Sequence, residues 1–140
     1  MAEPKRVYVD MVGDLFHPGH VALLRAAREF GDHLVVGVLS DETVAAYKRR
    51  PIMTLDERVT VIAACRYVDE VIPDAPFRVT QDFLDSHDLA VVVHGDDVGP
   101  EAVADVFGPA HEAGLLRLVP RTGDISTTEI IARVRSSVDG

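Results

Sequence analysis

The sequence has little cysteine, a shortage of basic side chains and no long apolar run, and each shortage excludes a class of protein. Its single cysteine, Cys65, cannot form an internal disulfide, which is typical of the reducing cytoplasm. Lys and Arg number 14 against 23 Asp and Glu, so the net charge of −9 argues against binding to nucleic acid or to anionic membranes. No stretch reaches the roughly 18–20 apolar residues of a membrane span. Residues 1–6 lead directly into an expected strand, so we expect a cytoplasmic protein without a signal peptide.

Several common catalytic signatures are also missing. There is no Gly-x-x-x-x-Gly-Lys-Ser/Thr P-loop and no Gly-x-Gly-x-x-Gly dinucleotide fingerprint. The His-Glu-x-x-His zinc helix and the Gly-x-Ser-x-Gly serine-hydrolase elbow are absent as well. Any enzymatic chemistry must therefore come from a different arrangement of side chains.

The order of apolar segments predicts the fold class. Its 140 residues suit one domain, 1–140, which we expect either to stand alone or to be part of a longer bifunctional chain. Apolar runs of strand length alternate with segments of helical period, as in βαβ units. Strands are expected at 6–12, 34–39, 68–72, 90–94 and 115–119, and helices at 18–30, 41–47, 54–66, 80–87, 101–113 and 129–138. Right-handed crossovers then give an α/β, Rossmann-like, doubly wound parallel sheet with strand order 3-2-1-4-5.

Two histidines lie where the first expected strand gives way to the first helix, in the stretch Asp14-Leu15-Phe16-His17-Pro18-Gly19-His20. Ligands of open parallel sheets bind at the carboxyl ends of the strands, and the start of a helix offers N–H groups to phosphate. Gly19 lets the backbone approach a ligand closely. The plain alternative is a pair of surface histidines in a loop.

Three further segments supply charge and hydroxyl groups. The loop 121–128 offers the Arg121 guanidinium followed by the hydroxyls of Ser126 and Thr127, which form a phosphate cradle or cap the last helix. Lys48 is a mobile point charge suited to phosphate oxygens, or else a solvated surface lysine. Arg58 lies one turn into its helix, where it faces the same cleft and binds substrate, or forms an intrahelical pair with a nearby carboxylate.

The fourth strand ends in Gly95-Asp96-Asp97, which accepts hydrogen bonds from a base or ribose, binds a metal, or simply forms a turn. In the predicted topology the loops at 10–20, 48–58, 94–97 and 121–128 all open on one edge of the sheet. Imidazoles, a lysine and a guanidinium around a phosphate cradle indicate phosphoryl or nucleotidyl transfer, which depends on positioning and charge neutralisation.

With these motifs the chain resembles the cytidylyltransferases of the HxGH nucleotidyltransferase superfamily. The first motif is His17-Pro18-Gly19-His20, and the family's Arg-Thr-Glu-Gly-Ile-Ser-Thr-Thr is similar to residues 121–128. The segments 65–71 and 94–97 look familial too. HxGH alone leaves an ATP-using adenylyltransferase open, whereas Arg121 followed by Ile125-Ser126-Thr127-Thr128 favours CTP.

The resemblance implies a role for each motif residue. His17 and His20 contact the CTP phosphates and stabilise the pentacoordinate α-phosphorus, while Asp14 orients their loop. Lys48 binds the acceptor's anionic group and the α-phosphate, and Arg121 holds the nucleotide and the leaving pyrophosphate. The implied nucleotide contacts are Asp10, Met11, Val12, Gly19, Asp96, Arg121, Thr122, Ile125, Ser126 and Thr127.

The resemblance also implies that Mg²⁺ arrives on the CTP phosphates without protein ligands, and that a homodimer forms through Arg66–Asp69. Two departures from the family pattern concern the nucleotide. Gly123-Asp124 replaces Glu-Gly in the second motif, which adds a carboxylate near phosphate. Met11 and Gly13 stand where relatives often have Gly and Phe.

The acceptor is left open among small alcohols that carry a phosphate or phosphonate. Residues 74–83 look closer to the phosphocholine and phosphoethanolamine enzymes than to the glycerol 3-phosphate enzymes. A compact domain of this type also resembles the cytidylyltransferases of phosphonate biosynthesis, and our expectation leans slightly to 2-hydroxyethylphosphonate. A nucleotide-binding regulatory module without turnover is a further alternative, against which the intact HxGH motif argues.

Overall fold

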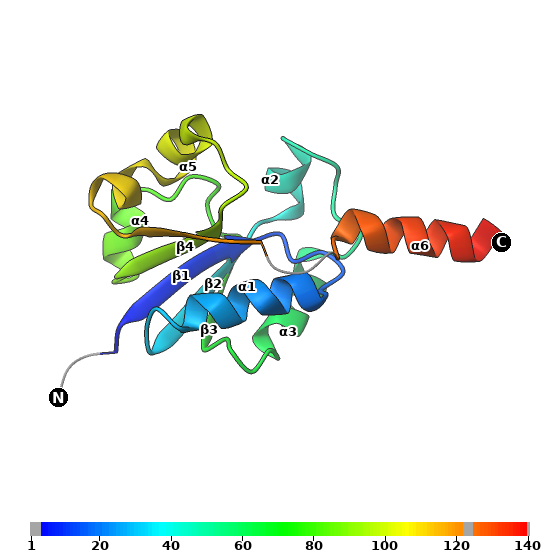
Figure 1. The fold of residues 1–140 in the computed structure, drawn as a ribbon, viewed down its shortest axis with the longest axis horizontal. Helices are drawn as coiled ribbons and strands as arrows, with labels where there is room; N and C mark the ends of the chain where they lie inside the picture. Colours follow the sequence, from blue (N-terminus) through cyan, green and yellow to red (C-terminus); the bar gives the residue numbers. More distant parts are fainter. Residues whose placement is uncertain (1–3, 122–124, 140) are drawn as a thin grey trace.

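The computed structural model describes residues 4–121 and 125–139 of the chain, and its centre is a five-stranded sheet (Figure 1). Its strands run parallel in the order β3-β2-β1-β4-β5, which confirms the predicted 3-2-1-4-5 topology. They are β1 (Arg6–Met11), β2 (His33–Val38), β3 (Glu70–Pro73), β4 (Val91–Gly95) and β5 (Leu116–Val119). Strand order reverses between β1 and β4, so these two strands flank the switch point at which ligands bind in such sheets.

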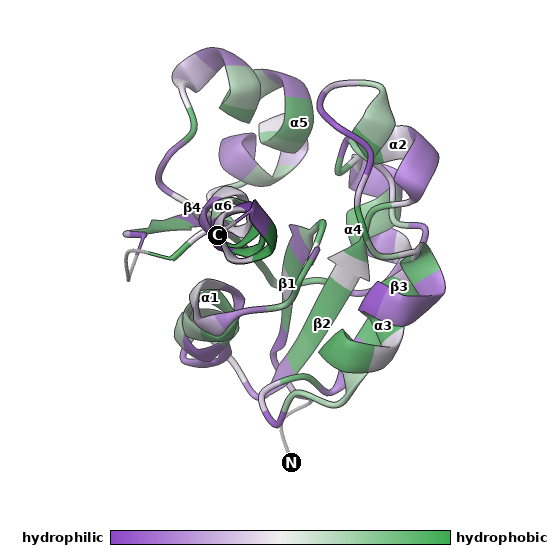
Figure 2. Cartoon of the chain, turned by 90° about the vertical axis from the view of Figure 1, so that its right-hand side faces the viewer, coloured by the Kyte–Doolittle hydropathy of each residue, from purple (hydrophilic) through white to green (hydrophobic). Residues whose placement is uncertain are grey.

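Helices cover both faces of the sheet, and Figures 1 and 2 show the resulting layers. Ranges are α1 (Pro18–Arg28), α2 (Asp41–Ala45), α3 (Leu55–Ala63), α4 (Gln81–Ser86), α5 (Pro100–Glu112) and α6 (Thr127–Asp139). One core layer joins the sheet to α1 and α3 through Leu24, Ala27 and Ile62. On the other face, Leu84 of α4 and Phe107 of α5 pack against Tyr8 and its neighbours on the sheet.

Burial on both faces explains why the central strands read as continuous apolar runs. Val7, Tyr8 and Val9 of β1, and Leu34 to Val36 of β2, have no exposed surface. By contrast, α6 has no buried residue and projects from the carboxyl edge of the sheet (Figure 1). No helix in the described residues is both long and apolar enough to cross a membrane.

Side-chain caps set the starts of three helices. Ser40 accepts a hydrogen bond from Thr43 N, and Thr80 accepts one from Phe83 N. Thr54 and Glu57 form a reciprocal capping box at the start of α3. Each cap fixes the direction in which a loop at the carboxyl edge enters its helix.

The segment after α3 differs from the prediction. The helix ends at Ala63 instead of about residue 66, and β3 begins at Glu70 instead of Val68. Between the two elements, the Asp69 carboxylate accepts a hydrogen bond from Leu34 N and forms an ion pair with Arg28, which holds this turn beside the start of β2.

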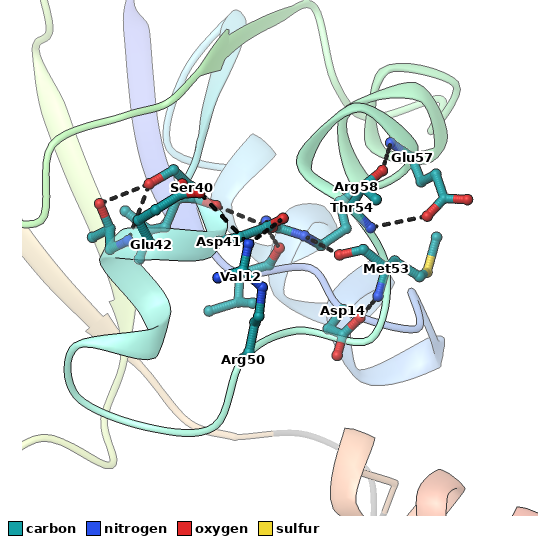
Figure 3. A network of polar contacts seen from close by, with 12 residues as sticks. Val12, Asp14, Ser40, Asp41, Glu42, Arg50, Met53, Thr54, Glu57 and Arg58 are labelled. Atoms are coloured by element: carbon teal, nitrogen blue, oxygen red, sulfur yellow. Dashed lines mark hydrogen bonds and ion pairs between the residues drawn. The ribbon is translucent and has the colours of Figure 1, made fainter.

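Arg58 does not face the ligand cleft, which corrects its predicted role in substrate binding. Its side chain is 0% exposed, and it donates to the main-chain oxygens of Val12 and Leu39 at 2.7 Å each and of Met53 at 3.1 Å. Its remaining partner is the Asp41 carboxylate at the start of α2 (Figure 3). An unpaired buried charge would cost free energy, and these partners satisfy the guanidinium. Arg58 thus links the ends of β1 and β2 to the starts of α2 and α3.

Candidate active site

A cavity of about 780 Å³ opens at the carboxyl edge of the sheet, where the loops after β1, β2, β4 and β5 meet. The structure brings most of the predicted site residues together in its lining: Asp10, Met11, Val12, Asp14, His17, Gly19, His20, Lys48, Arg121, Ile125, Ser126 and Thr127. Asp96 is not among the lining residues; its main-chain N–H bonds to Val119 O, and its neighbour Asp97 lines the cavity instead. Thr122, Gly123 and Asp124 lie outside the described residues.

The two histidines cap α1 with their own imidazoles. His17 Nδ1 accepts a hydrogen bond from Gly19 N at 3.0 Å, and His20 Nδ1 accepts one from His17 N at 3.1 Å. This is a capping box in which imidazoles replace the usual hydroxyl and carboxylate. Because a main-chain N–H can only donate, each Nδ1 must be unprotonated, and the proton of each neutral ring lies on Nε2. The cap therefore leaves two Nε2–H donors free for phosphate oxygens.

Both imidazoles are neutral at pH 7. Burial, and secondly the Arg121 charge, lower the pKa of His17. Burial lowers the pKa of His20 to about 4, assisted by His17 and Lys48 and opposed by Asp14. The rings lie 3.9 Å apart between centroids, and Phe16 stacks on His20. A neutral donor pair binds phosphate without the repulsion that two imidazolium ions would suffer at this distance.

Gly19 is required for steric reasons. A Cβ at this position would lie 2.7 Å from His17 Cε1 and 3.2 Å from Ile125 O. The first contact would displace the His17 ring from its cap. The second shows that the C-terminal motif packs directly on the histidine turn.

Asp14 joins three of the four loops. Its carboxylate accepts hydrogen bonds from Ile52 N and Met53 N, each at 2.9 Å, and its main-chain oxygen accepts one from the Thr127 hydroxyl at 3.0 Å. The side chain of Asp14 is buried. These bonds hold the histidine turn, the segment before α3 and the start of α6 in one fixed arrangement (Figure 3 shows the contact to Met53).

Ser126 caps α6, as one of its two predicted roles requires, because its Oγ accepts from Glu129 N at 3.1 Å. Its side chain also lines the cavity, so both roles are compatible. Arg121 lowers the pKa of His17, which places its guanidinium within electrostatic reach of that imidazole. Cationic and hydroxyl groups from the C-terminal motif thus face the imidazoles across one cavity.

Lys48 lies at the rim beside an aromatic wall. Burial, and secondly the Arg49 charge, lower its pKa, while Asp14 opposes them. Its Nζ lies 5.6 Å from the centre of the Tyr47 ring, which in turn packs against Phe77 at 5.0 Å. Sequence reasoning missed this wall, because nothing local indicates that two aromatic residues thirty positions apart meet at the cavity.

Asp10 forms the floor of the cavity at the end of β1. It is 8% exposed, and burial raises the pKa of its carboxyl to about 7. Burial, and secondly the charge of Asp10, raise the pKa of Tyr47, so the carboxylate lies close to the aromatic wall. The nearest ion-pair partner recorded among residues 4–121 and 125–139 is His94 Nδ1 at 3.8 Å. An acid this poorly paired is suited to a cation that arrives with a ligand.

The described residues contain no group of three or more His, Cys, Asp or Glu side chains placed to hold a metal ion. Magnesium carried by the triphosphate stays a prediction.

Replacing His17 with Asn distinguishes its two roles, the helix cap made by Nδ1 and the hydrogen-bond donor at Nε2. Asn is a good N-cap, so the variant should keep the wild-type free energy of unfolding within about 0.5 kcal/mol, whereas His17→Ala should lose about 1 kcal/mol. Both variants lack Nε2–H and should lose turnover by about 100-fold or more. Urea unfolding and steady-state rates check this; near-normal turnover in His17→Asn would contradict the assigned donor.

Replacing Asp10 with Asn should stabilise the fold at neutral pH. Since the pKa of Asp10 rises from about 4 in the unfolded chain to about 7 in the fold, the native state binds more protons over this range and loses stability as pH rises through it. The variant should therefore match the wild type at pH 4 and exceed it by up to about 4 kcal/mol at pH 8. Urea unfolding at both pH values measures the difference; an equal or lower stability at pH 8 would show that the carboxylate is not buried unpaired.

Comparison with known proteins agrees with this geometry. The sequence model of the Cytidylyltransferase-like family matches residues 13–133. An ethanolamine-phosphate cytidylyltransferase of Dictyostelium discoideum is 46% identical over 93% of this chain and 38% of its own length. A choline-phosphate cytidylyltransferase A of Rattus norvegicus is 41% identical over 97% of this chain and 38% of its own. The chain thus spans about two fifths of these relatives.

A solved structure supports the fold. The lipopolysaccharide core biosynthesis protein of Thermoplasma volcanium GSS1 superposes with a TM-score of 0.69 at 23% identity, over 89% of this chain and all of that one. At this identity the likeness concerns the fold alone. The match over residues 13–133 takes in the imidazole cap, the lysine loop and the C-terminal motif, and so this chain belongs to the Cytidylyltransferase-like family.

Proposed function

We propose that this chain catalyses cytidylyl transfer from CTP to the phosphate of a small amino alcohol, with release of pyrophosphate. An oxygen of the acceptor phosphate attacks the α-phosphorus in line, and the bond from that phosphorus to the bridging oxygen of pyrophosphate breaks. No covalent intermediate with the protein forms. The Nε2–H groups of His17 and His20 donate to the phosphate oxygens on which charge accumulates, and their cap fixes them before substrate arrives.

The cationic groups divide between the two substrates. Arg121 and the hydroxyls of Ser126 and Thr127 hold the nucleotide side, and Lys48 bridges the acceptor phosphate and the α-phosphate. Mg²⁺ enters with the triphosphate and supplies charge neutralisation when bound. The homodimer expected through Arg66–Asp69 stays a proposal: Arg66 is exposed, while Asp69 is already engaged with Arg28.

The observation that carries the acceptor assignment is the buried Asp10 carboxylate in the same cavity. In this proposal the acceptor phosphate binds at Lys48, and the aromatic wall of Tyr47 and Phe77 lines the same cavity as the Asp10 carboxylate. An ammonium group is attracted both to the carboxylate and to the ring faces. Phosphoethanolamine and phosphocholine carry such a group, whereas glycerol 3-phosphate and 2-hydroxyethylphosphonate do not. The names of the relatives in the previous section support the same class.

Pyrophosphate release with a panel of acceptors tests the proposal. With CTP, phosphoethanolamine or phosphocholine should exceed glycerol 3-phosphate and 2-hydroxyethylphosphonate in kcat/KM by about 100-fold, because one carboxylate–ammonium contact in a buried site supplies about that factor. Asp10→Asn should remove most of this advantage.

Other outcomes would replace the proposal with a specific alternative. Preference for the phosphonate would establish the acceptor that our sequence analysis favoured slightly. Turnover with ATP in place of CTP would indicate an adenylyltransferase. Nucleotide binding without turnover on any acceptor would indicate the regulatory module.

A further inference from the structure

His94 and Asp10 form a polar pair on the sheet face that floors the cavity. Val7 and Tyr8 of β1 pair with Val91 and Val92 of β4, and the same register continued by two residues sets Asp10 beside His94. Both line the cavity, and the atoms His94 Nδ1 and Asp10 Oδ1 are 3.8 Å apart. This distance is too long for a direct hydrogen bond.

The buried nitrogen of this pair has no partner. His94 Nδ1 has less than 1 Å² of exposed surface and no hydrogen bond within residues 4–121 and 125–139. The ring is held from behind by Phe107, at 4.9 Å between centroids. A buried polar atom without a partner costs free energy, so it points to a group that is supplied by a ligand.

In the tautomer with its proton on Nε2, the imidazole is an acceptor at Nδ1. Burial lowers the pKa of His94, with Asp97 opposing it, so the ring is neutral at pH 7 and one nitrogen carries a lone pair. A donor nitrogen about 2.9 Å from both Asp10 Oδ1 and His94 Nδ1 would see them about 80° apart, which two N–H bonds of a tetrahedral ammonium reach with modest bending. A trimethylammonium group has no N–H and would leave Nδ1 unpartnered.

We propose that His94 selects the acceptor substrate by the number of methyl groups on its nitrogen. Together with Asp10 it accepts hydrogen bonds from a primary ammonium, and so it selects a primary amino alcohol phosphate over a trimethylammonium one. This inference rests on the proposed function. Asp10 supplies attraction for any ammonium, whereas His94 supplies a directional acceptor that only N–H bonds can use. His94 is thus a specificity residue that takes no part in the transfer step.

Steady-state kinetics with CTP and two acceptors, phosphoethanolamine and phosphocholine, test the inference. The wild type should prefer phosphoethanolamine. His94→Ala should lower kcat/KM for phosphoethanolamine by about tenfold or more, chiefly through KM, and leave phosphocholine unchanged or improved. His94→Asn, whose side-chain oxygen replaces the acceptor, should retain most of the preference.

Two controls separate selectivity from folding. Phe107→Leu loosens the packing behind the same ring but keeps the acceptor, so it should retain the preference for phosphoethanolamine. CTP affinity and thermal unfolding of each variant report whether the fold is intact. If His94→Ala does not fold, His94→Asn and Phe107→Leu still test whether a hydrogen-bond acceptor at this position preserves the preference. Turnover of both acceptors with an unchanged ratio in His94→Ala, or a wild-type preference for phosphocholine, would overturn the inference and leave the proposed function standing. Absence of turnover with either acceptor in the wild type would overturn both.

Discussion

The hydrogen bonds of Asp14 are the constraint on which the site depends. Its carboxylate fixes the segment before α3, and its main-chain oxygen receives the Thr127 hydroxyl, more than a hundred residues away in the sequence. Gly19 then lets the main chain of Ile125 approach the histidine turn. Two short motifs from opposite ends of the chain become one surface because a single buried residue bonds to both neighbours. Without that link, the two motifs would not be held as one surface.

The charged side chains divide into those that are paired inside the fold and those that face the cavity. Arg58, the most deeply buried cation, is neutralised by Asp41 and main-chain oxygens and braces the loops from behind (Figure 3). The imidazoles are neutral with their protons on Nε2, and Lys48 and Arg121 supply the positive charge in the cavity lining. The unpaired carboxylate of Asp10 lowers the free energy of unfolding at neutral pH. Such a cost is typical of ligand-binding sites.

Sequence patterns predicted what depends on local chemistry. Apolar runs of strand length and segments of helical period placed every strand and helix, and crossover handedness gave the strand order. Contacts between residues that are distant in the sequence could not be predicted in this way. The burial of Arg58 depends on carbonyls from two other strand ends, and the lining by Asp97 instead of Asp96 depends on how Asp96 N bonds to Val119. The aromatic wall and the His94–Asp10 pair likewise arise from packing across elements.

The central claim is that one nucleotide touches both ends of the chain at once. Titration of ¹⁵N-labelled protein with CTP, followed by amide chemical shifts, tests it most directly. Amides of Gly19 and His20 in the first motif and of Ser126 and Thr127 in the second should shift together and saturate with one dissociation constant. Shifts confined to one motif, or two different dissociation constants, would contradict the account.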